Sequence, residues 1–166
     1  MTTGLLSGFF QHAYVTNDMA RARQQFAERW GVPSFLEFES QLALTTARGV
    51  EAAHLKIALA FVGDLQVELI EPVAGPGTAI YRQVLPDSGY RVVWHHFGYR
   101  LPRRPGAWEQ FRAGVGGPRY PIAIEGHIQA EYGEVRFAYL DTYAELGHYS
   151  EYVWSSFDID AAVPRS

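Results

Sequence analysis

The order of expected strands and helices repeats after about 80 residues, and this repeat limits the possible folds more than any other feature. In the first half, the hydrophobic pattern predicts a strand, a helix and three strands at 9–16, 17–30, 35–40, 54–62 and 65–71. In the second half, it predicts the same series at 92–101, 105–113, 120–128, 134–141 and 148–154. The chain therefore reads as two strand–helix–strand–strand–strand modules.

The domain organisation follows from this repeat. At 166 residues, 48% hydrophobic and 19% charged, the sequence fits one globular domain over 1–166. The first module spans 9–71 and the second spans 92–154. A Gly- and Pro-rich connection with a short helix at 79–85 joins them. The tail at 155–166 is polar, and we expect it to be loosely held.

Charge and composition exclude several classes of function. The net charge is −4 and no basic stripe is present, so nucleic acid is not an expected partner. Arg100, Arg103 and Arg104 form the one close basic cluster, which is either a solvated edge or a clamp for an anionic substrate group. The absence of cysteine excludes disulfides, thiolate ligands and a cysteine nucleophile. The sequence has no apolar run of about 18 residues and no signal peptide, so we expect a cytoplasmic protein without a membrane span.

Histidine and glutamate recur at matching places in the two modules. His12 and His96 lie on the first strand of each module, and Glu68 and Glu151 lie on the last strand. His12 precedes Glu68 by 56 positions, and His96 precedes Glu151 by 55. We therefore expect these four residues to form one site from two equivalent His–Glu pairs.

Strand alternation gives a second test, because alternate side chains share a face. Glu68 shares its face with Gln66 and Ile70, which leaves Val67 and Leu69 to pack beneath a helix. By the same reasoning, Glu151 shares its face with Tyr149 and Val153. On the first strand, His12 is expected to lie with Phe10 and Tyr14, and Ala13 and Val15 to lie under the helix. His95 is expected to face away from His96.

Two imidazoles and two carboxylates suit one divalent metal ion. Such a mixed set, with two open positions, is consistent with Zn, Ni, Co, Mn or Fe. A substrate with two adjacent oxygens would take the open positions, and the metal would polarise its carbonyl group.

The sequence also resembles the vicinal-oxygen-chelate superfamily, which includes glyoxalase I, methylmalonyl-CoA epimerase, extradiol dioxygenases and bleomycin-resistance proteins. The resemblance lies in the segment from His12 to Met19, in Val67 to Pro72, in the His95–His96–Phe97 run, and in Ser150 to Val153. It implies an α+β fold in which two βαβββ modules pair into a curved, barrel-like mixed sheet with helices outside. It also implies that His12, Glu68, His96 and Glu151 are the metal ligands. The His–Glu–His–Glu set is like that of bacterial glyoxalase I, whereas the epimerase has glutamine as its second ligand. The residues after Glu68 lack the aromatic-rich motif of glyoxalase I.

The expected function is that of a metal-dependent, glyoxalase-like lyase or isomerase. It would act on a carbonyl or thioester substrate through a metal-stabilised enolate, with Glu68 or Glu151 as the catalytic group that moves the proton. Tyr14, Tyr99, His148 and Tyr149 are candidate substrate contacts, and each is otherwise a packing residue. The alternatives are a protein of the same fold that binds an aromatic or drug-like ligand without catalysis, and an Fe(II) dioxygenase. We expect a small-molecule substrate and a homodimer.

Overall fold

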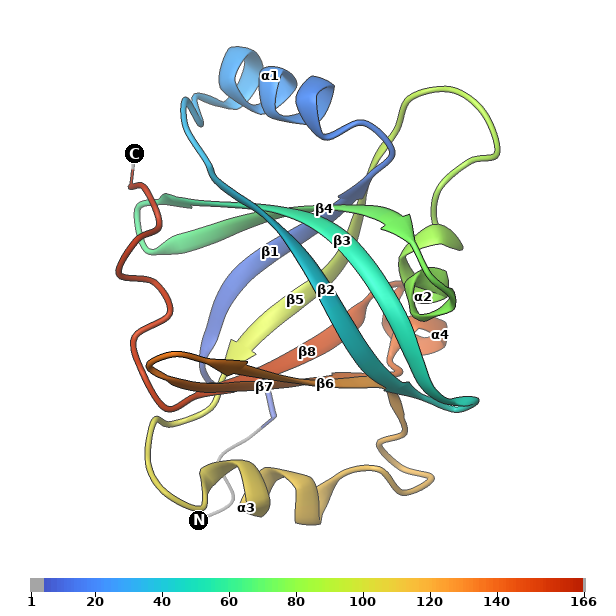
Figure 1. The fold of residues 1–166 in the computed structure, drawn as a ribbon, viewed down its shortest axis with the longest axis vertical. Helices are drawn as coiled ribbons and strands as arrows, with labels where there is room; N and C mark the ends of the chain where they lie inside the picture. The colour runs from blue at the N-terminus through green and yellow to red at the C-terminus, as the bar shows by residue number, and fades with distance from the viewer. Residues whose placement is uncertain (1–4, 166) are drawn as a thin grey trace.

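The computed structural model describes residues 5–165, which form eight strands and several short helices around one barrel (Figure 1). The elements of the first half are β1 (Phe9–Thr16), α1 (Met19–Trp30), β2 (Leu36–Thr46), β3 (Gly49–Val62) and β4 (Leu65–Ala74). The connection contains the 3₁₀ helix η1 (Pro76–Thr78) and α2 (Ala79–Arg82). The elements of the second half are β5 (Val92–Arg100), α3 (Ala107–Gly114), β6 (Ile122–Ala130), β7 (Gly133–Leu140), α4 (Tyr143–Leu146) and β8 (Tyr149–Ser155).

The eight strands close into a barrel in the order β1-β4-β3-β2-β6-β7-β8-β5. Within each half, the first and last strands pair in parallel (β1 with β4, β5 with β8), and the remaining pairs are antiparallel. The sheet is therefore mixed, and each half contributes one βαβββ module. The expected fold class, two such modules in a curved, barrel-like sheet with helices outside, is confirmed.

The two modules meet along two seams of unequal length. The β1–β5 seam is long, with paired residues from Phe9 to Thr16 on β1. The β2–β6 seam consists of three pairs that begin at Leu44 and end at Thr46. Because β1 and β5 lie side by side, the first strands of the two modules present their inward side chains to the same part of the barrel.

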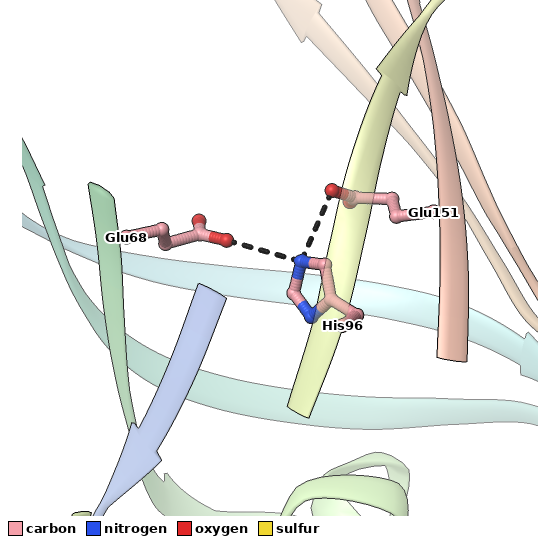
Figure 2. Close-up of side chains that lie close together, drawn as sticks. All are labelled: Glu68, His96 and Glu151. Carbon is pink, nitrogen blue, oxygen red and sulfur yellow. Dashed lines mark ion pairs between the residues drawn. The ribbon is translucent and has the colours of Figure 1, made fainter. Parts of the chain in front are cut away.

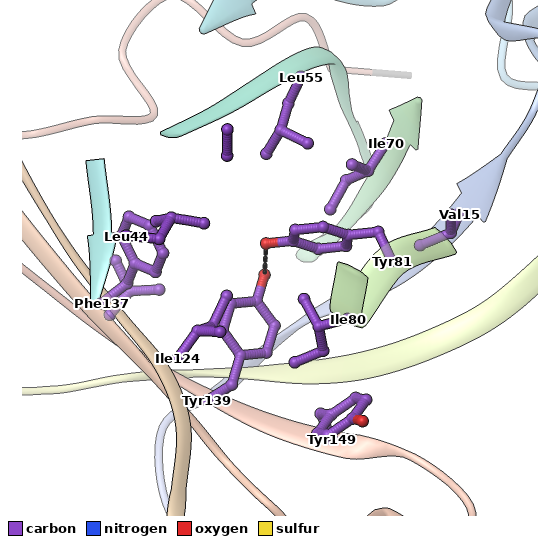
Figure 3. Packing of buried hydrophobic residues seen from close by; sticks show 12 residues of the cluster. Val15, Leu44, Leu55, Ile70, Ile80, Tyr81, Ile124, Phe137, Tyr139 and Tyr149 are labelled. Atoms are coloured by element: carbon purple, nitrogen blue, oxygen red, sulfur yellow. Dashed lines mark hydrogen bonds between the residues drawn. The ribbon is translucent and has the colours of Figure 1, made fainter. Parts of the chain in front are cut away.

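Helices cover the barrel from outside and fill one of its ends. Phe26 of α1 packs on the outer faces of β3 and β4, and Trp108 and Phe111 of α3 pack on those of β5, β7 and β8. The inner cluster contains side chains from most strands together with Ile80 and Tyr81 of α2 (Figure 3). The inner end near α2 is thus a packed core rather than an open channel.

Two segments differ from their sequence-based descriptions. Strand β2 pairs over its whole length with the Gly49–Leu59 part of β3, and the two form a longer hairpin than expected. The expectation of a loose tail is wrong for its described part: Val163 is buried, and the backbone N–H of Phe61 on β3 donates to the carbonyl of Pro164 at 2.8 Å. The tail thus follows the barrel end opposite α2 (Figure 1). Burial of Val163 and the bond to Phe61 hold it there.

The longest helix in the described part of the chain is α1, with 12 residues. None of the helices among residues 5–165 has the length and apolar character that a membrane crossing requires.

Candidate metal centre

Two β-bulges determine which side chains of β1 and β5 face the barrel interior. The register between these strands shifts between Phe9 and Gln11, which makes Phe10 an extra residue on β1. A second shift makes His95 an extra residue on β5. A bulge sets two successive residues against one partner, so strict alternation fails there. This explains why Phe10 and Gln11 both face inward, and why His95 is buried inside beside His96.

Three ionisable side chains converge inside the barrel from three strands. Nε2 of His96 on β5 lies 3.3 Å from Oε2 of Glu68 on β4 and 3.3 Å from Oε2 of Glu151 on β8 (Figure 2). The three residues are 9% or less exposed, and their ligand atoms lie within 4.8 Å of one another. These three residues can therefore hold a metal ion, and all of them come from one chain.

The electrostatics of this group depend on whether a cation lies between the carboxylates. Burial lowers the pKa of His96, but its attraction to Glu151 and then to Glu68 outweighs burial and raises the pKa to about 9. Burial raises the pKa of Glu68, and Glu151 adds to that effect. Without a metal, a protonated His96 supplies the positive charge that two buried carboxylates need.

A hydrogen-bond relay orients the His96 ring. Nε2 of His95 lies 3.1 Å from the carbonyl oxygen of Ile80, and the two Nδ1 atoms of His95 and His96 are 2.9 Å apart. A carbonyl oxygen only accepts, so His95 donates from Nε2 and, as a neutral ring, accepts at Nδ1. Burial lowers the pKa of His95 to about 3, so its ring is neutral. His96 then donates from Nδ1, so in the neutral ring that would bind a metal the Nε2 lone pair is directed into the space between Glu68 and Glu151.

The chemistry of these groups fits a divalent ion. Nε2 of His96 is buried and forms no hydrogen bond, although two carboxylate oxygens face it. A nitrogen lone pair between two carboxylates is a donor set that first-row divalent metals accept. In most histidine ligands, one ring nitrogen binds the metal and the other donates a hydrogen bond that orients the ring.

Several solved structures are similar to this chain over nearly their whole length. A methylmalonyl-CoA epimerase from Mycobacterium tuberculosis matches with a TM-score of 0.58 and 13% identity, covering 98% of this chain and 97% of that chain. A single-residue variant of the Streptomyces coelicolor methylmalonyl-CoA epimerase in complex with 2-nitronate-propionyl-CoA matches with a TM-score of 0.59 and 14% identity, covering 92% and 99%. The chain has the fold of the methylmalonyl-CoA epimerases. The fold that the sequence resemblance implied is thereby confirmed.

A third match is a methylmalonyl-CoA epimerase in complex with methylmalonyl-CoA and NH4+, with a TM-score of 0.55 and 16% identity, covering 97% of this chain and 99% of that chain. Neither a protein-family model nor a curated protein matches the sequence.

His12 does not lie with the other three residues of the expected site. Its ring packs against Phe97 at 4.8 Å and Phe9 at 5.5 Å between ring centroids. The residues on either side of it, Gln11 and Ala13, are buried inside the barrel. Because alternate side chains of a strand point to opposite faces, His12 faces outward. The predicted inner and outer faces of β1 are therefore exchanged: Tyr14 packs under α1 against Phe26, and Val15 joins the inner cluster. The sequence allowed either assignment of the faces, since β1 has apolar residues on both.

The four candidate substrate contacts lie in different places. Tyr14 packs beneath α1, and Tyr99 stacks on Tyr152 beneath α3, so both belong to outer clusters. His148 packs against Trp94 and Phe97. Tyr149 alone of the four joins the inner cluster, where its ring lies beside His95 at 5.1 Å.

Other residues around the three-residue group had weaker sequence signals. Tyr139 on β7 packs edge-on to His96 at 4.7 Å, and its hydroxyl lies 3.3 Å from that of Tyr81, which is the donor (Figure 3). Gln11 lies on the inner face of β1, where its amide contacts Gln66. In the sequence, a glutamine next to a histidine does not stand out as a functional residue. The spacing of the two-module repeat is not precise enough to choose position 11 over position 12.

A cavity of about 1330 Å³ lies between α3 and the C-terminal tail, outside the three-residue group. Arg100, Arg103 and Arg104 line it together with aromatic side chains such as Phe111 and Tyr152. None of Glu68, His96 and Glu151 is among its lining residues. The arginine cluster noted in the sequence thus borders a cavity, with Arg100 paired to Asp160.

Proposed function

We propose that this protein is a metal-dependent isomerase or lyase that moves a proton on the carbon next to a carbonyl or thioester group. One observation carries the proposal: Glu68 and Glu151 converge on a buried nitrogen of His96 that forms no hydrogen bond, inside a barrel of the epimerase fold. Glu68, His96 and Glu151 would hold the ion, which we expect to be Zn, Ni, Co, Mn or Fe. When bound, such an ion polarises a substrate carbonyl and makes the adjacent C–H more acidic.

The glutamates supply the group that moves the proton. Burial raises the pKa of Glu68 in the metal-free protein. We infer that one of the two glutamates leaves the ion and acts as the base that removes the substrate proton. Glu151, on β8 of the second module, lies at the same distance from His96 as Glu68 does. Two carboxylates on either side of one centre suit a reaction in which one side removes a proton and the other returns it. Buried surroundings also keep bulk water from the carbanion-like species.

Thioesters of coenzyme A are the first substrates to test, because two of the similar structures hold methylmalonyl-CoA or 2-nitronate-propionyl-CoA. Adducts of 2-oxoaldehydes with thiols are the second class, since they carry the same acidic carbon beside a carbonyl. The metal content of protein purified without added metal should first be measured, and again after loading with Zn, Ni, Co or Mn. Exchange of the substrate α-proton should then be followed by NMR in D2O.

Glu68→Gln and Glu151→Gln are the decisive variants, and at least one should lower the exchange rate by more than about 100-fold while metal stays bound. Glu134→Gln is a matched control, because Glu134 contacts His127 at 2.7 Å on a distant part of the surface. Its exchange rate should equal that of the unchanged protein. Full exchange in both site variants would refute the role of the glutamates, and failure to take up any metal would refute the proposal as a whole.

A second candidate function is ligand binding without catalysis, and the large cavity beneath α3 favours it. Arginines and aromatic rings line that cavity, which suits an aromatic or amphipathic anion. Equilibrium binding of such ligands to metal-free protein, unaffected by Glu68→Gln, would support this function over catalysis. The homodimer and the cytoplasmic location stay predictions.

A further inference from the structure

We propose that the cavity between α3 and the C-terminal tail binds an organic carboxylate with an apolar body, and that Arg100 anchors its carboxylate. In the structure, Asp160 of the tail holds the place on Arg100 that the ligand would take. The inference rests on the cavity of the second candidate function and adds a ligand class and an anchor to it. It is separate from the metal centre, because none of Glu68, His96 and Glu151 lines the cavity.

The charge of the cavity wall favours an anion. The side chains that line it include four arginines but two aspartates, so positive charge is in excess: Arg100, Arg103, Arg104 and Arg165 against Asp158 and Asp160. Arg104 donates to the neutral side chain of Gln110 at 2.6 Å, which leaves its charge uncompensated there. A concave surface with an excess of one charge attracts ligands of the opposite charge.

Arg100 is the arginine best placed to hold a carboxylate. It ends β5, and its guanidinium lies over the ring of Phe10, 4.1 Å from the ring centroid. Nη1 lies 2.5 Å from Oδ2 of Asp160, whereas Nε and Nη2 are buried and form no hydrogen bond. These two nitrogens share the edge of the guanidinium that binds a carboxylate through two parallel bonds. Arg100 therefore has an unused bidentate edge, and its side chain is still 38% exposed.

Asp160 is a partner that a free carboxylate can replace. It belongs to the segment 156–165, which contains no helix and follows the barrel end. Its Oδ2 faces Arg100, and its Oδ1 accepts from Nε2 of Gln66 at 3.0 Å. A ligand that pairs with Arg100 would leave the bond to Gln66 in place. Because one carboxylate replaces another, the guanidinium keeps a counter-charge throughout.

The rest of the wall determines the body of the ligand. Apolar side chains from α3, β8 and the tail line the cavity, among them Phe111, Tyr152, Phe157 and Val163. Its volume of about 1330 Å³ is far larger than an inorganic anion would fill. Each CH2 group that leaves water for such a wall adds to affinity. A medium-chain carboxylate therefore suits the site, with the chain against the apolar wall and the head on Arg100.

Decanoate and decan-1-ol test the site, because they have the same chain and differ in the charged head. Binding should be measured by isothermal titration calorimetry on the protein as purified and again after removal of metal. Decanoate should bind more tightly than decan-1-ol, with the same affinity in both preparations. Arg100→Gln should weaken decanoate binding by about 10-fold or more and leave decan-1-ol nearly unchanged. Arg23→Gln is the matched control and should change neither, because Arg23 pairs with Glu37 outside the cavity.

Two further variants test the competitor and the location. Asp160→Asn keeps a side-chain oxygen for Gln66 and removes the competing charge, so decanoate should bind about 5-fold or more tightly. Gly114 lines the cavity, and a Cβ atom added there would meet no heavy atom within 4 Å. Gly114→Trp should therefore fill the cavity and weaken both ligands by more than about 10-fold. Gly117→Trp is its control, because Gly117 is equally open but does not line the cavity.

Several outcomes would overturn the proposal. Equal affinity for decanoate and decan-1-ol would remove the role of charge, and unchanged decanoate binding in Arg100→Gln would remove the anchor. If Arg100→Gln does not fold, Asp160→Asn decides instead, and an unchanged or lower decanoate affinity would refute the competition. Unchanged binding in Gly114→Trp would place the ligand elsewhere. Absence of decanoate binding by the unchanged protein would refute the site, without any bearing on proton exchange at the metal centre.

Discussion

The two modules present the same positions to the centre of the barrel, but they fill and support those positions differently. The second module contributes His96 and Glu151, and its histidine is held by His95 and the carbonyl of Ile80 in the connection between modules. The first module contributes Glu68 and, at the position equivalent to His96, Gln11. Gln11 is held through Gln66 by Asp160 in the C-terminal tail.

This difference shows that a symmetric fold does not require the same residues at equivalent positions. Each module places a polar side chain, Gln11 or His96, at one position of its first strand and a glutamate on its last strand. The supporting residues come from segments outside the repeat, namely the α2 connection on one side and the tail on the other. These segments cover opposite ends of the barrel (Figure 1), so each orients the donor nearest to it.

The largest effect should follow from loss of the second module's donor. His96→Ala should lower metal affinity by more than about 100-fold, because it removes the one nitrogen of the site. It should also destabilise the metal-free protein by about 3–5 kcal/mol, since Glu68 and Glu151 lose their buried counter-charge. Metal analysis and urea unfolding measure the two effects. Unchanged metal content would show that His96 is not a ligand.

The two small residues at the centre offer a direct comparison of the modules. Gly98→Ala should cost about 1–3 kcal/mol and should lower metal affinity, because its new Cβ would meet the Gln11 side chain. Ala13→Gly, at the equivalent position, removes a methyl group and should leave metal affinity nearly unchanged. Unfolding curves and chelator competition on both variants check this. Equal loss of affinity in the two would argue against a role for Gln11.

Loss of the tail support should have an intermediate effect on the first module alone. Asp160→Ala removes the acceptor that orients Gln66, so the amides of Gln66 and Gln11 can rotate. We expect metal affinity to fall by about 10-fold, as is common when a group that orients a ligand is removed. A titration of the metal-free protein with Co2+ against a competing chelator measures the affinity. A loss of stability without any change in affinity would mean that Asp160 only anchors the tail.

The smallest effect should come from the tyrosine pair at the α2 end of the barrel. Tyr139→Phe removes the acceptor of the Tyr81 hydroxyl and should cost about 0.5–1.5 kcal/mol. Metal content should stay the same, because the Tyr139 ring that packs against His96 is retained. Thermal unfolding and metal analysis together test this. A loss of metal would instead assign the hydroxyl a role in the site.

Much of the architecture could be predicted from the sequence, and the reason is the repeat. Two βαβββ patterns, each with a glutamate on its last strand, are visible in the spacing of apolar residues. The inner and outer faces of β4 and β8 were predicted correctly, because each strand has a glutamate on one face and mainly apolar residues on the other. On β4, for example, Val67 and Leu69 pack under α1, whereas Ile70 faces inward with Glu68. The tail was predicted poorly, because one buried valine and an ion pair are weak signals in a polar segment.

The pattern of residues in the sequence determined the two modules and the candidate residues Glu68, His96 and Glu151, and the family resemblance implied the mixed, curved sheet. Tertiary structure alone decided which residue of the first strand faces the barrel interior and which partners orient Gln11 and His96. The physical reason is the two-residue period of a strand, in which a shift of one position exchanges the inner and outer faces. The bulges at Phe10 and His95 interrupt that period, and they arise from pairing between strands about 80 residues apart in the chain.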